Sequence, residues 1–98
     1  MTEEAAETLR LDKWLWQARF FKTRGLSAAL VSKGRVRVNG QPVSKPGRTI
    51  RPGDVLTFPQ GDRVRVIRVR AIGDRRGPAA EAQGLYRDLD EDGPSSLE

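Results

Sequence analysis

Lysine and arginine are the residues of this chain whose number and spacing could do chemistry, and nearly all of them lie between residues 10 and 76. That stretch holds 17 Lys and Arg residues against four acids, a net charge of +13, whereas the segments 1–9 and 77–98 are acidic. Ammonium and guanidinium groups bind phosphate through charge-assisted hydrogen bonds. A compact basic body between acidic ends is typical of a protein that binds a polyanion. We disfavour the alternative, a basic surface without a partner, because like charges at this density repel one another.

The composition argues against enzymatic and metal-binding chemistry. The 98 residues include no cysteine and no histidine, which excludes disulfides and thiolate metal sites and removes the commonest general base. The four acids of the basic body are scattered, and they form no recognisable catalytic constellation. We therefore expect no enzyme activity, no cofactor and no metal site. No apolar run reaches the roughly 18 residues of a membrane span, and the acidic start does not resemble a signal peptide, so we expect a cytoplasmic protein.

Two short helices are expected to position the first basic residues. The first helix shows apolar residues at i, i+3, i+4 and i+7, the spacing of one buried face: Leu11, Trp14, Leu15 and Ala18. After a short connection, Thr23 is a suitable N-cap for a second helix, and Gly34 supplies the left-handed residue that ends it. The expected apolar face of this second helix consists of Leu26, Ala29 and Leu30.

A hairpin and a longer pair of strands are expected after the helices. Asn39-Gly40 stands between two short alternating segments, which is the strongest short-range signal of a type I′ hairpin. Pro42 cannot donate to a strand ladder, so the second arm should be short or lie at a sheet edge. Residues 45–51 should form a flexible loop, followed by strands over 54–58 and 63–71, with a bulge at Val66–Ile67 where the alternation slips. The expected core consists of Leu11, Trp14, Leu15, Leu26, Leu30, Val36, Val38, Val55 and Leu56.

The C-terminal part differs from the body. A glycine-bounded basic linker covers residues 73–77, and residues 78–88 read as a short helix with proline at its start. Residues 90–98 are acidic and rich in Gly, Pro and Ser, which favours disorder. The expected organisation is an acidic tail over 1–9, one domain over 10–72, and a linker, helix and acidic tail over 73–98. The expected class is α+β, with two helices packed on a small, mostly antiparallel sheet and a C-terminal helical tail.

Four motifs in order resemble the S-four RNA-binding domain, which is named for ribosomal small-subunit protein four. They are R-L-D-K-W-L from Arg10, K-T-R from Lys22, K-G-R-V-R-V-N-G from Lys33 and R-P-G-D-V from Arg51. The combination is specific, although each motif alone is weak, and it covers residues 10–58, about half the chain. The second helix of that domain usually opens with Ser-Arg, and Thr23 caps nearly as well as Ser. The resemblance implies an alpha-L RNA-binding motif.

The C-terminal part narrows the resemblance. The run D-R-R-G-P-A-A-E-A from Asp74, followed by Leu85-Tyr86, is similar to the tail of the fifteen-kilodalton bacterial heat-shock protein family. That resemblance implies a stand-alone, ribosome-associated stress protein. It implies binding to the free large ribosomal subunit that still carries a nascent chain on its tRNA, and help in recycling that particle. The implied partners are large-subunit ribosomal RNA and tRNA.

The candidate RNA site lies where the two helices meet the first hairpin. The free amides at the start of the second helix favour a phosphate, and Lys or Arg residues surround that point. The candidate RNA-binding residues are Arg10, Lys13, Lys22, Thr23, Arg24, Lys33, Arg35, Arg37, Lys45 and Arg48. We expect Asn39 to hold the turn rather than RNA. Four further arginines either contact RNA or guard a strand edge: Arg63, Arg65, Arg68 and Arg70.

The two tryptophans divide between core and surface. Trp14 lies on the apolar stripe and should be buried, whereas Trp16 points away from it. We favour packing of Trp16 under the C-terminal segment near Leu85 and Tyr86, and the alternative is stacking on an unpaired base. Phe20, Phe21 and Phe58 are expected in the core or at its rim.

Three other functions remain as alternatives. S-four domains are often fused to pseudouridine synthases, tRNA synthetases or methyltransferases, but we expect no second domain here to carry such chemistry. A general nucleic-acid binder that also binds DNA, acting outside the ribosome, would show no preference for structured RNA over duplex DNA. A protein-interaction module that works through its acidic tails would lose function when the tails are deleted. We expect a monomer.

Overall fold

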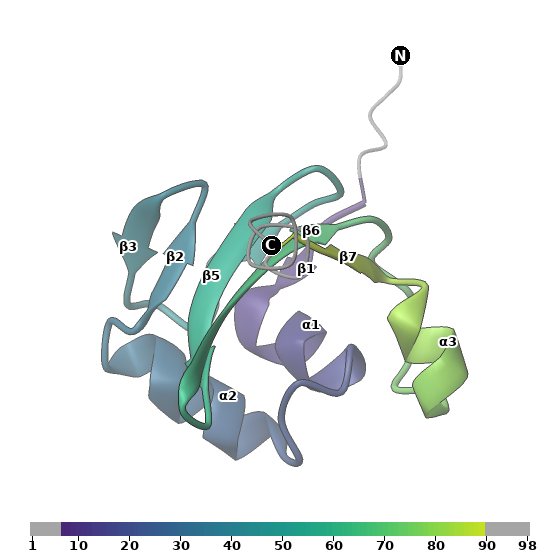
Figure 1. Ribbon diagram of the computed structural model, residues 1–98, viewed down its shortest axis with the longest axis horizontal. Coiled ribbons are helices and arrows are strands. Elements are labelled where there is room, and N and C mark those ends of the chain that lie inside the picture. Colours follow the sequence, from purple (N-terminus) through teal and green to yellow (C-terminus); the bar gives the residue numbers. More distant parts are fainter. Residues whose placement is uncertain (1–6, 90–98) are drawn as a thin grey trace, which may run out of the picture.

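The computed structural model describes residues 7–89 of the chain. A five-stranded antiparallel sheet, in the order β3-β2-β5-β6-β7, curves over two helices that pack on one of its faces (Figure 1). The helices are α1 (Leu11–Gln17) and α2 (Arg24–Ser32). The strands are β2 (Val36–Val38), β3 (Gln41–Val43), β5 (Val55–Gln60), β6 (Arg63–Val69) and β7 (Tyr86–Asp88). The expected α+β arrangement is therefore confirmed.

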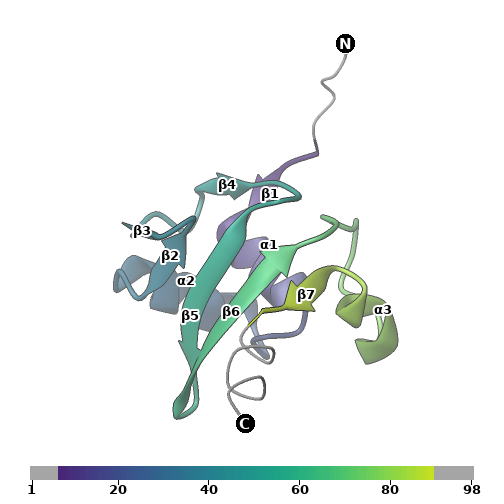
Figure 2. The same ribbon diagram turned by 45° about the horizontal axis from the view of Figure 1, so that its top comes forward.

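The other face of the sheet is open. Figure 2 shows β5 and β6 in front of α1 and α2, and no element of the described part of the chain lies over that outer side. A second, two-stranded sheet pairs β1 (Leu9–Arg10) with β4 (Thr49–Ile50), and a third helix, α3 (Ala79–Gln83), stands beside the end of β7. Among residues 7–89, no helix is long and apolar enough to cross a membrane.

Helix α1 has the predicted phase. Leu11, Trp14 and Leu15 are fully buried, and the indole Nε1 of Trp14 donates to the carbonyl of Ala71 at 2.9 Å. Burial of three large apolar side chains stabilises the fold by roughly 1.5–3 kcal/mol for each. The first backbone amides of α1 donate hydrogen bonds to carbonyls of the loop that follows β3. Residues Thr49 and Ile50 of that segment form β4, so the prediction of a loop over the whole of residues 45–51 is wrong, and its flexibility stays a prediction.

Helix α2 begins as predicted but faces the core with another side. The hydroxyl of Thr23 accepts from the amide of Leu26 at 3.1 Å, which confirms the N-cap. The expected apolar face is wrong, because Leu26 is 53% exposed, Ala29 is exposed and Leu30 is only partly buried. Ser27 and Val31 are buried instead. The hydroxyl of Ser27 donates to the backbone oxygen of Asp12 at 2.7 Å, so a polar side chain fits the helix interface with its hydrogen bond satisfied.

The predicted hairpin is confirmed in detail. Asn39 and Gly40 both have positive φ, 53° and 84°, as a type I′ turn requires, and they join β2 to the edge strand β3. The side chain of Asn39 accepts from the amide of Val55 at 2.9 Å and donates to Asp54 at 3.1 Å. Asn39 therefore has the structural role that was expected. Of the expected core, Val55 is only partly buried.

The predicted bulge in β6 is wrong. The register between β5 and β6 is continuous from Val55 opposite Arg68 to Gln60 opposite Arg63. The alternation slips in the sequence because Val64, which is 61% exposed, lies on the open face while Arg65 turns toward the helices. The Arg65 guanidinium lies 5.3 Å from the centre of the Phe20 ring and donates to the Asp88 carboxylate. A paired arginine thus occupies a position that the pattern reserves for an apolar residue.

The C-terminal segment is partly helical and partly strand. Helix α3 starts after Pro78 as predicted, but residues 86–88 form β7, with Tyr86 opposite Val69 on β6. The expected helix is therefore wrong in its second half. Trp16 contacts the linker before α3, where the guanidinium of Arg76 lies 5.6 Å from the ring and its Nε donates to the Trp16 carbonyl at 3.0 Å. The favoured packing near Leu85 and Tyr86 stays a prediction. The acidic segment predicted over residues 90–98 lies outside the described residues.

Candidate nucleic-acid interface

The starts of α1 and α2 meet at one carboxylate. Arg10, just before α1, donates through Nε and Nη2 to the two oxygens of Asp12, at 3.0 and 3.1 Å. Arg24, the first residue of α2, places its Nε 4.0 Å from Oδ2 of the same carboxylate. We call Arg10, Asp12 and Arg24 the helix-start cluster. It joins two segments of the chain that the connection over residues 18–23 separates.

The charges of the helix-start cluster differ in exposure. The Asp12 side chain is 5% exposed, whereas those of Arg10 and Arg24 are 52% and 43% exposed. The hydrogen bonds that Arg10 donates to Asp12, and then the negative charge of Asp12, raise the pKa of Arg10, and desolvation opposes this to a smaller extent. A nearly buried carboxylate therefore accepts two N–H donors of Arg10 and lies 4.0 Å from Nε of Arg24, while both arginine side chains stay about half-exposed. A guanidinium has five such donors, and Arg10 directs only part of them to Asp12.

The loop after β3 closes one side of the helix-start cluster. The amides of Leu11 and Asp12 donate to the carbonyls of Arg48 and Pro46, at 2.8 and 3.2 Å. The first amides of α1 are thus already paired. A helix N-terminus leaves about four amides without a partner inside the helix. At the start of α2, the Thr23 hydroxyl accepts from one of them, the amide of Leu26.

The ten predicted site residues fall into three groups. Lys13, Lys22 and Thr23 adjoin the helix-start cluster in the chain, and Lys45 and Arg48 belong to the loop that is tied to α1. Lys33 follows the last turn of α2 and so lies about 13 Å from its start, at 1.5 Å per residue. Arg35 and Arg37 lie elsewhere again, on or beside β2, so the structure does not bring all ten residues together.

Arg35 and Arg37 belong to the open face of the sheet. Their neighbours Val36 and Val38 are buried toward the helices, and Arg37 stands opposite Thr57 on β5. Both arginines line a groove of about 470 Å³ with Gly40, Thr57, Phe58, Pro59 and Val64. Arg35 also borders a second groove, of about 490 Å³, that Lys22 and the exposed Leu26 line on the side of α2.

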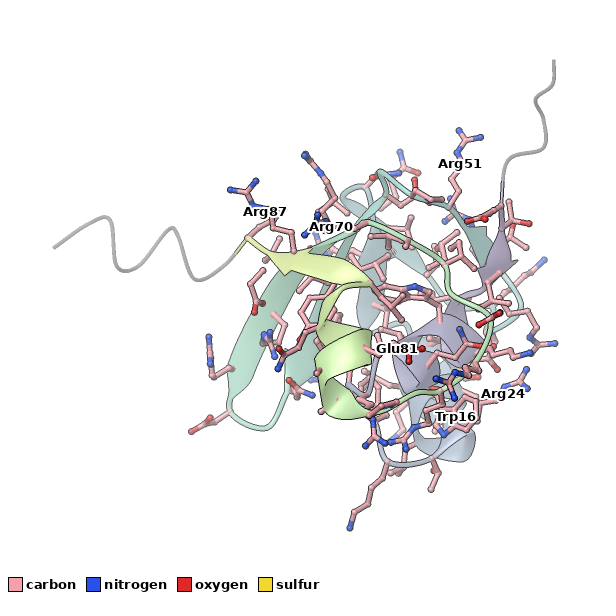
Figure 3. All side chains as sticks on the ribbon, turned by 90° about the vertical axis from the view of Figure 1, so that its right-hand side faces the viewer. Trp16, Arg24, Arg51, Arg70, Glu81 and Arg87 are labelled. Atoms are coloured by element: carbon pink, nitrogen blue, oxygen red, sulfur yellow. The ribbon has the colours of Figure 1, made fainter. Side chains whose placement is uncertain are left out.

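Further arginines lie outside the helix-start cluster and outside the predicted site. Arg68 lies directly opposite Arg87 on the open face, because β7 extends the sheet. Figure 3 shows Arg70 and Arg87 close together, on the side of the molecule opposite Arg24 and Trp16. Arg51 lines a polar hollow of about 270 Å³ together with Arg48. The alternation of residues 63–71 contained the signal for Arg68 and Arg70, whereas no sequence signal marked β7.

Metal binding finds no support in the part of the chain that the structure describes. Among residues 7–89, no group of three or more acidic or other metal-ligating side chains lies close enough to hold an ion.

Comparison with known proteins gives concordant likenesses. The family model of the S4 domain matches residues 9–56. Heat shock protein 15 of Escherichia coli K12 is 45% identical over 91 residues, which are 93% of this chain and 68% of that protein. The RQC P-site tRNA stabilizing factor of Bacillus subtilis is 32% identical over 84 residues, 86% of this chain and 95% of that protein. A solved structure of Vibrio cholerae heat shock protein 15, described as trimeric, matches with a TM-score of 0.81 and 45% identity, over 87% of this chain and 85% of that one.

Proposed function

The chain belongs to the S4 domain family and, within it, to the heat shock protein 15 family, and from this premise we propose that it is a non-enzymatic, ribosome-associated RNA-binding protein. The helix-start cluster carries the proposal. Two half-exposed arginine side chains there lie within 4.0 Å of one nearly buried carboxylate, and one of them, Arg10, donates two hydrogen bonds to it. A guanidinium can bind one phosphate through two parallel N–H donors, which adds geometric specificity to the attraction of charge.

The position of Arg24 supports a phosphate in particular. Arg24 is the first residue of α2, where a positive side chain opposes the helix dipole unless an anion is present. Lys22 lies two residues earlier, before the N-cap, and the first turn of α2 contains no acidic residue. A phosphate at this point would meet the free amides of α2 and both arginines of the helix-start cluster. Lys13, Thr23, Lys45 and Arg48 would border the same contact.

The RNA that we propose is structured large-subunit ribosomal RNA. The chain would bind free large subunits that still carry a nascent chain on tRNA, and help to recycle them during heat stress. The name of the Bacillus subtilis relative, a P-site tRNA stabilizing factor, supports tRNA as a second contact. The name heat shock protein 15 supports a role in the stress response. The remaining candidate contacts are Lys33, Arg35 and Arg37, and the last two would act from the open face.

Crosslinking in living cells tests this proposal. The tagged full-length chain is crosslinked by ultraviolet light during heat stress, and the attached RNA is sequenced. We expect reads from large-subunit ribosomal RNA and tRNA, and their loss in the Arg24→Ala variant. Reads spread evenly over messenger RNA would contradict the ribosomal role. Equal binding of the purified chain to duplex DNA and to structured RNA would instead support a general nucleic-acid binder.

We further propose that the RNA-binding form is a monomer. The alternative is a trimer, because the solved structure of the Vibrio cholerae relative is described as trimeric. Sedimentation velocity of the free chain and of its RNA complex distinguishes the two states. One chain per RNA is the expected result, and a trimer in both samples would contradict it.

A further inference from the structure

An acid in a phosphate-binding surface calls for a physical reason. The carboxylate of Asp12 lies within 4 Å of both guanidinium groups of the helix-start cluster, and one oxygen, Oδ2, faces both of them. By Coulomb's law a negative charge at this place repels a phosphate that binds the same two arginines. The sequence could avoid that repulsion with a neutral residue. Asp12 must therefore supply something that offsets it.

What Asp12 supplies is the geometry of its neighbours. Arg10 is held by two hydrogen bonds to the two carboxylate oxygens, which fixes the plane of its guanidinium group. The guanidinium carbon also lies close to Gly47, where an added Cβ would be 3.7 Å away. Arg24 approaches Oδ2 from the other helix. The carboxylate itself is 5% exposed and belongs to the first turn of α1, so it is fixed by the core.

We propose that Asp12 is a positioning residue that holds Arg10 and Arg24 as a pair, so that their free donors bind one phosphate group of the RNA. This inference rests on the proposed function and names the ligand of its central site. The negative charge reduces the repulsion between the two guanidinium groups when no RNA is bound. It also removes rotamer freedom from two long side chains before binding, which lowers the entropy cost of binding. Arg10 and Arg24 make the contact, and Asp12 acts only through them.

The test is a substitution whose effect has the opposite sign to the one that charge alone predicts. Asp12→Asn keeps the shape of the side chain and makes the chain more positive by one charge. We expect RNA binding to weaken about tenfold, because the arginines lose their anchor. The matched control is Asp62→Asn, in the turn between β5 and β6, which adds the same charge away from the arginine pair. We expect this control to bind as tightly as the wild type or slightly more tightly.

Two further measurements distinguish positioning from a general loss of structure. The slope of log affinity against log salt should become less steep by about one contact in Asp12→Asn, because one phosphate is no longer held. In an Arg10→Ala, Arg24→Ala background, Asp12→Asn should no longer weaken binding. Thermal melts report whether each variant is folded.

If Asp12→Asn does not fold, Arg10→Lys answers the same question, because it preserves charge and the buried residue but loses the two-donor geometry. Arg10→Lys should bind several times more weakly, and Arg87→Lys is its control.

The outcomes separate this inference from the proposed function. A folded Asp12→Asn variant that binds as tightly as the wild type, with the same salt slope, overturns the positioning role and leaves RNA binding intact. Arg10→Lys binding at wild-type strength overturns it as well. A wild-type chain that does not bind structured RNA overturns the proposed function, and the positioning role with it.

Discussion

Replacing Arg24 by alanine should weaken RNA binding and leave the fold intact. The Arg24 side chain is 43% exposed, and its Nε lies 4.0 Å from Asp12 Oδ2. Because Asp12 keeps its two hydrogen bonds from Arg10, the loss of a contact at that distance should cost only about 0–1 kcal/mol of the free energy of unfolding. The same charge stands at the N-terminus of α2, where it is unfavourable by a few tenths of a kcal/mol. The two effects nearly cancel, so stability should change by less than about 1 kcal/mol.

The effect on binding should be larger, because it depends on a contact with a charged ligand. A hydrogen bond to a charged group contributes about 1.5–3 kcal/mol, and part of that loss is offset when neighbouring cations shift toward the phosphate. We therefore expect a loss of about 1–3 kcal/mol, which corresponds to roughly 5- to 150-fold weaker binding. Lys22, the preceding cation, cannot replace the contact fully, since an ammonium does not present two parallel donors.

Filter binding to a ribosomal RNA fragment at one fixed salt concentration measures the loss, with thermal melts of the same samples. Arg87→Ala is the matched control, because it removes one arginine from the opposite side of the molecule (Figure 3). It should bind nearly as the wild type does. Equal affinities for Arg24→Ala and the wild type would move the RNA site away from the start of α2. Loss of the folded state in Arg24→Ala would show that this arginine is structural.

Four other outcomes are expected. Affinity should fall roughly a thousandfold between 50 and 200 mM salt, as for a protein with six to ten phosphate contacts, and a flat response measured by filter binding would refute the phosphate site. At physiological salt, structured RNA should compete much better than duplex DNA in a competition assay. In urea unfolding, Val31→Ala should lower the free energy of unfolding by about 2 kcal/mol, because Val31 is buried. Leu26→Ala should lower it by less than about 1 kcal/mol, because Leu26 is 53% exposed. Equal losses would contradict the orientation of α2. RNA affinity should be nearly constant between pH 6 and 8, since the sequence has no histidine or cysteine, and a change of tenfold would point to an unrecognised titrating group.

Local signals predicted α1 and the first hairpin correctly. The stripe of α1 depends on residues within two turns of one another, and Trp14 and Leu15 are indeed fully buried. The Asn39-Gly40 turn depends on two residues that tolerate positive φ, and both adopt it. In each case the physical cause of the structure lies within a few residues of the chain, so a single sequence contains it.

The errors arise where the cause is a distant partner. The face of α2 is set by Ser27, whose hydroxyl is satisfied by the backbone of Asp12, 15 residues earlier. The strands β1, β4 and β7 have two or three residues each, too few for a recognisable alternation. The position of Arg65 depends on Asp88, 23 residues later. Hydrophobic periodicity assigns a serine or an arginine to the solvent-facing side of an element. Its inward position is understood only when the distant residue that binds it is known.

The sequence identified the types of residue in the candidate site better than their positions in the fold. The sequence identified the cations at the starts of both helices, and the structure brings Arg10 and Arg24 to one carboxylate. It also grouped Arg35 and Arg37 with them, although strand alternation sends both to the open face. Asp12 lies in the first turn of α1, where its charge favours the helix dipole, and the sequence analysis assigned it no place in the site. Its contacts with arginines before and after it could not be read from spacing.

Asp12 explains why the R-L-D-K motif and the candidate site coincide. Every polar group of this residue has a partner in a different segment: its amide donates to Pro46, its carbonyl accepts from Ser27, and its carboxylate accepts from Arg10 and faces Arg24. One residue thus fixes the loop after β3, the start of α2 and the start of α1 relative to each other. These are the segments that supply most of the proposed phosphate contacts. The geometry of the site is therefore set by the same buried hydrogen bonds that hold the two helices together, so a ligand that fits it meets an arrangement already formed.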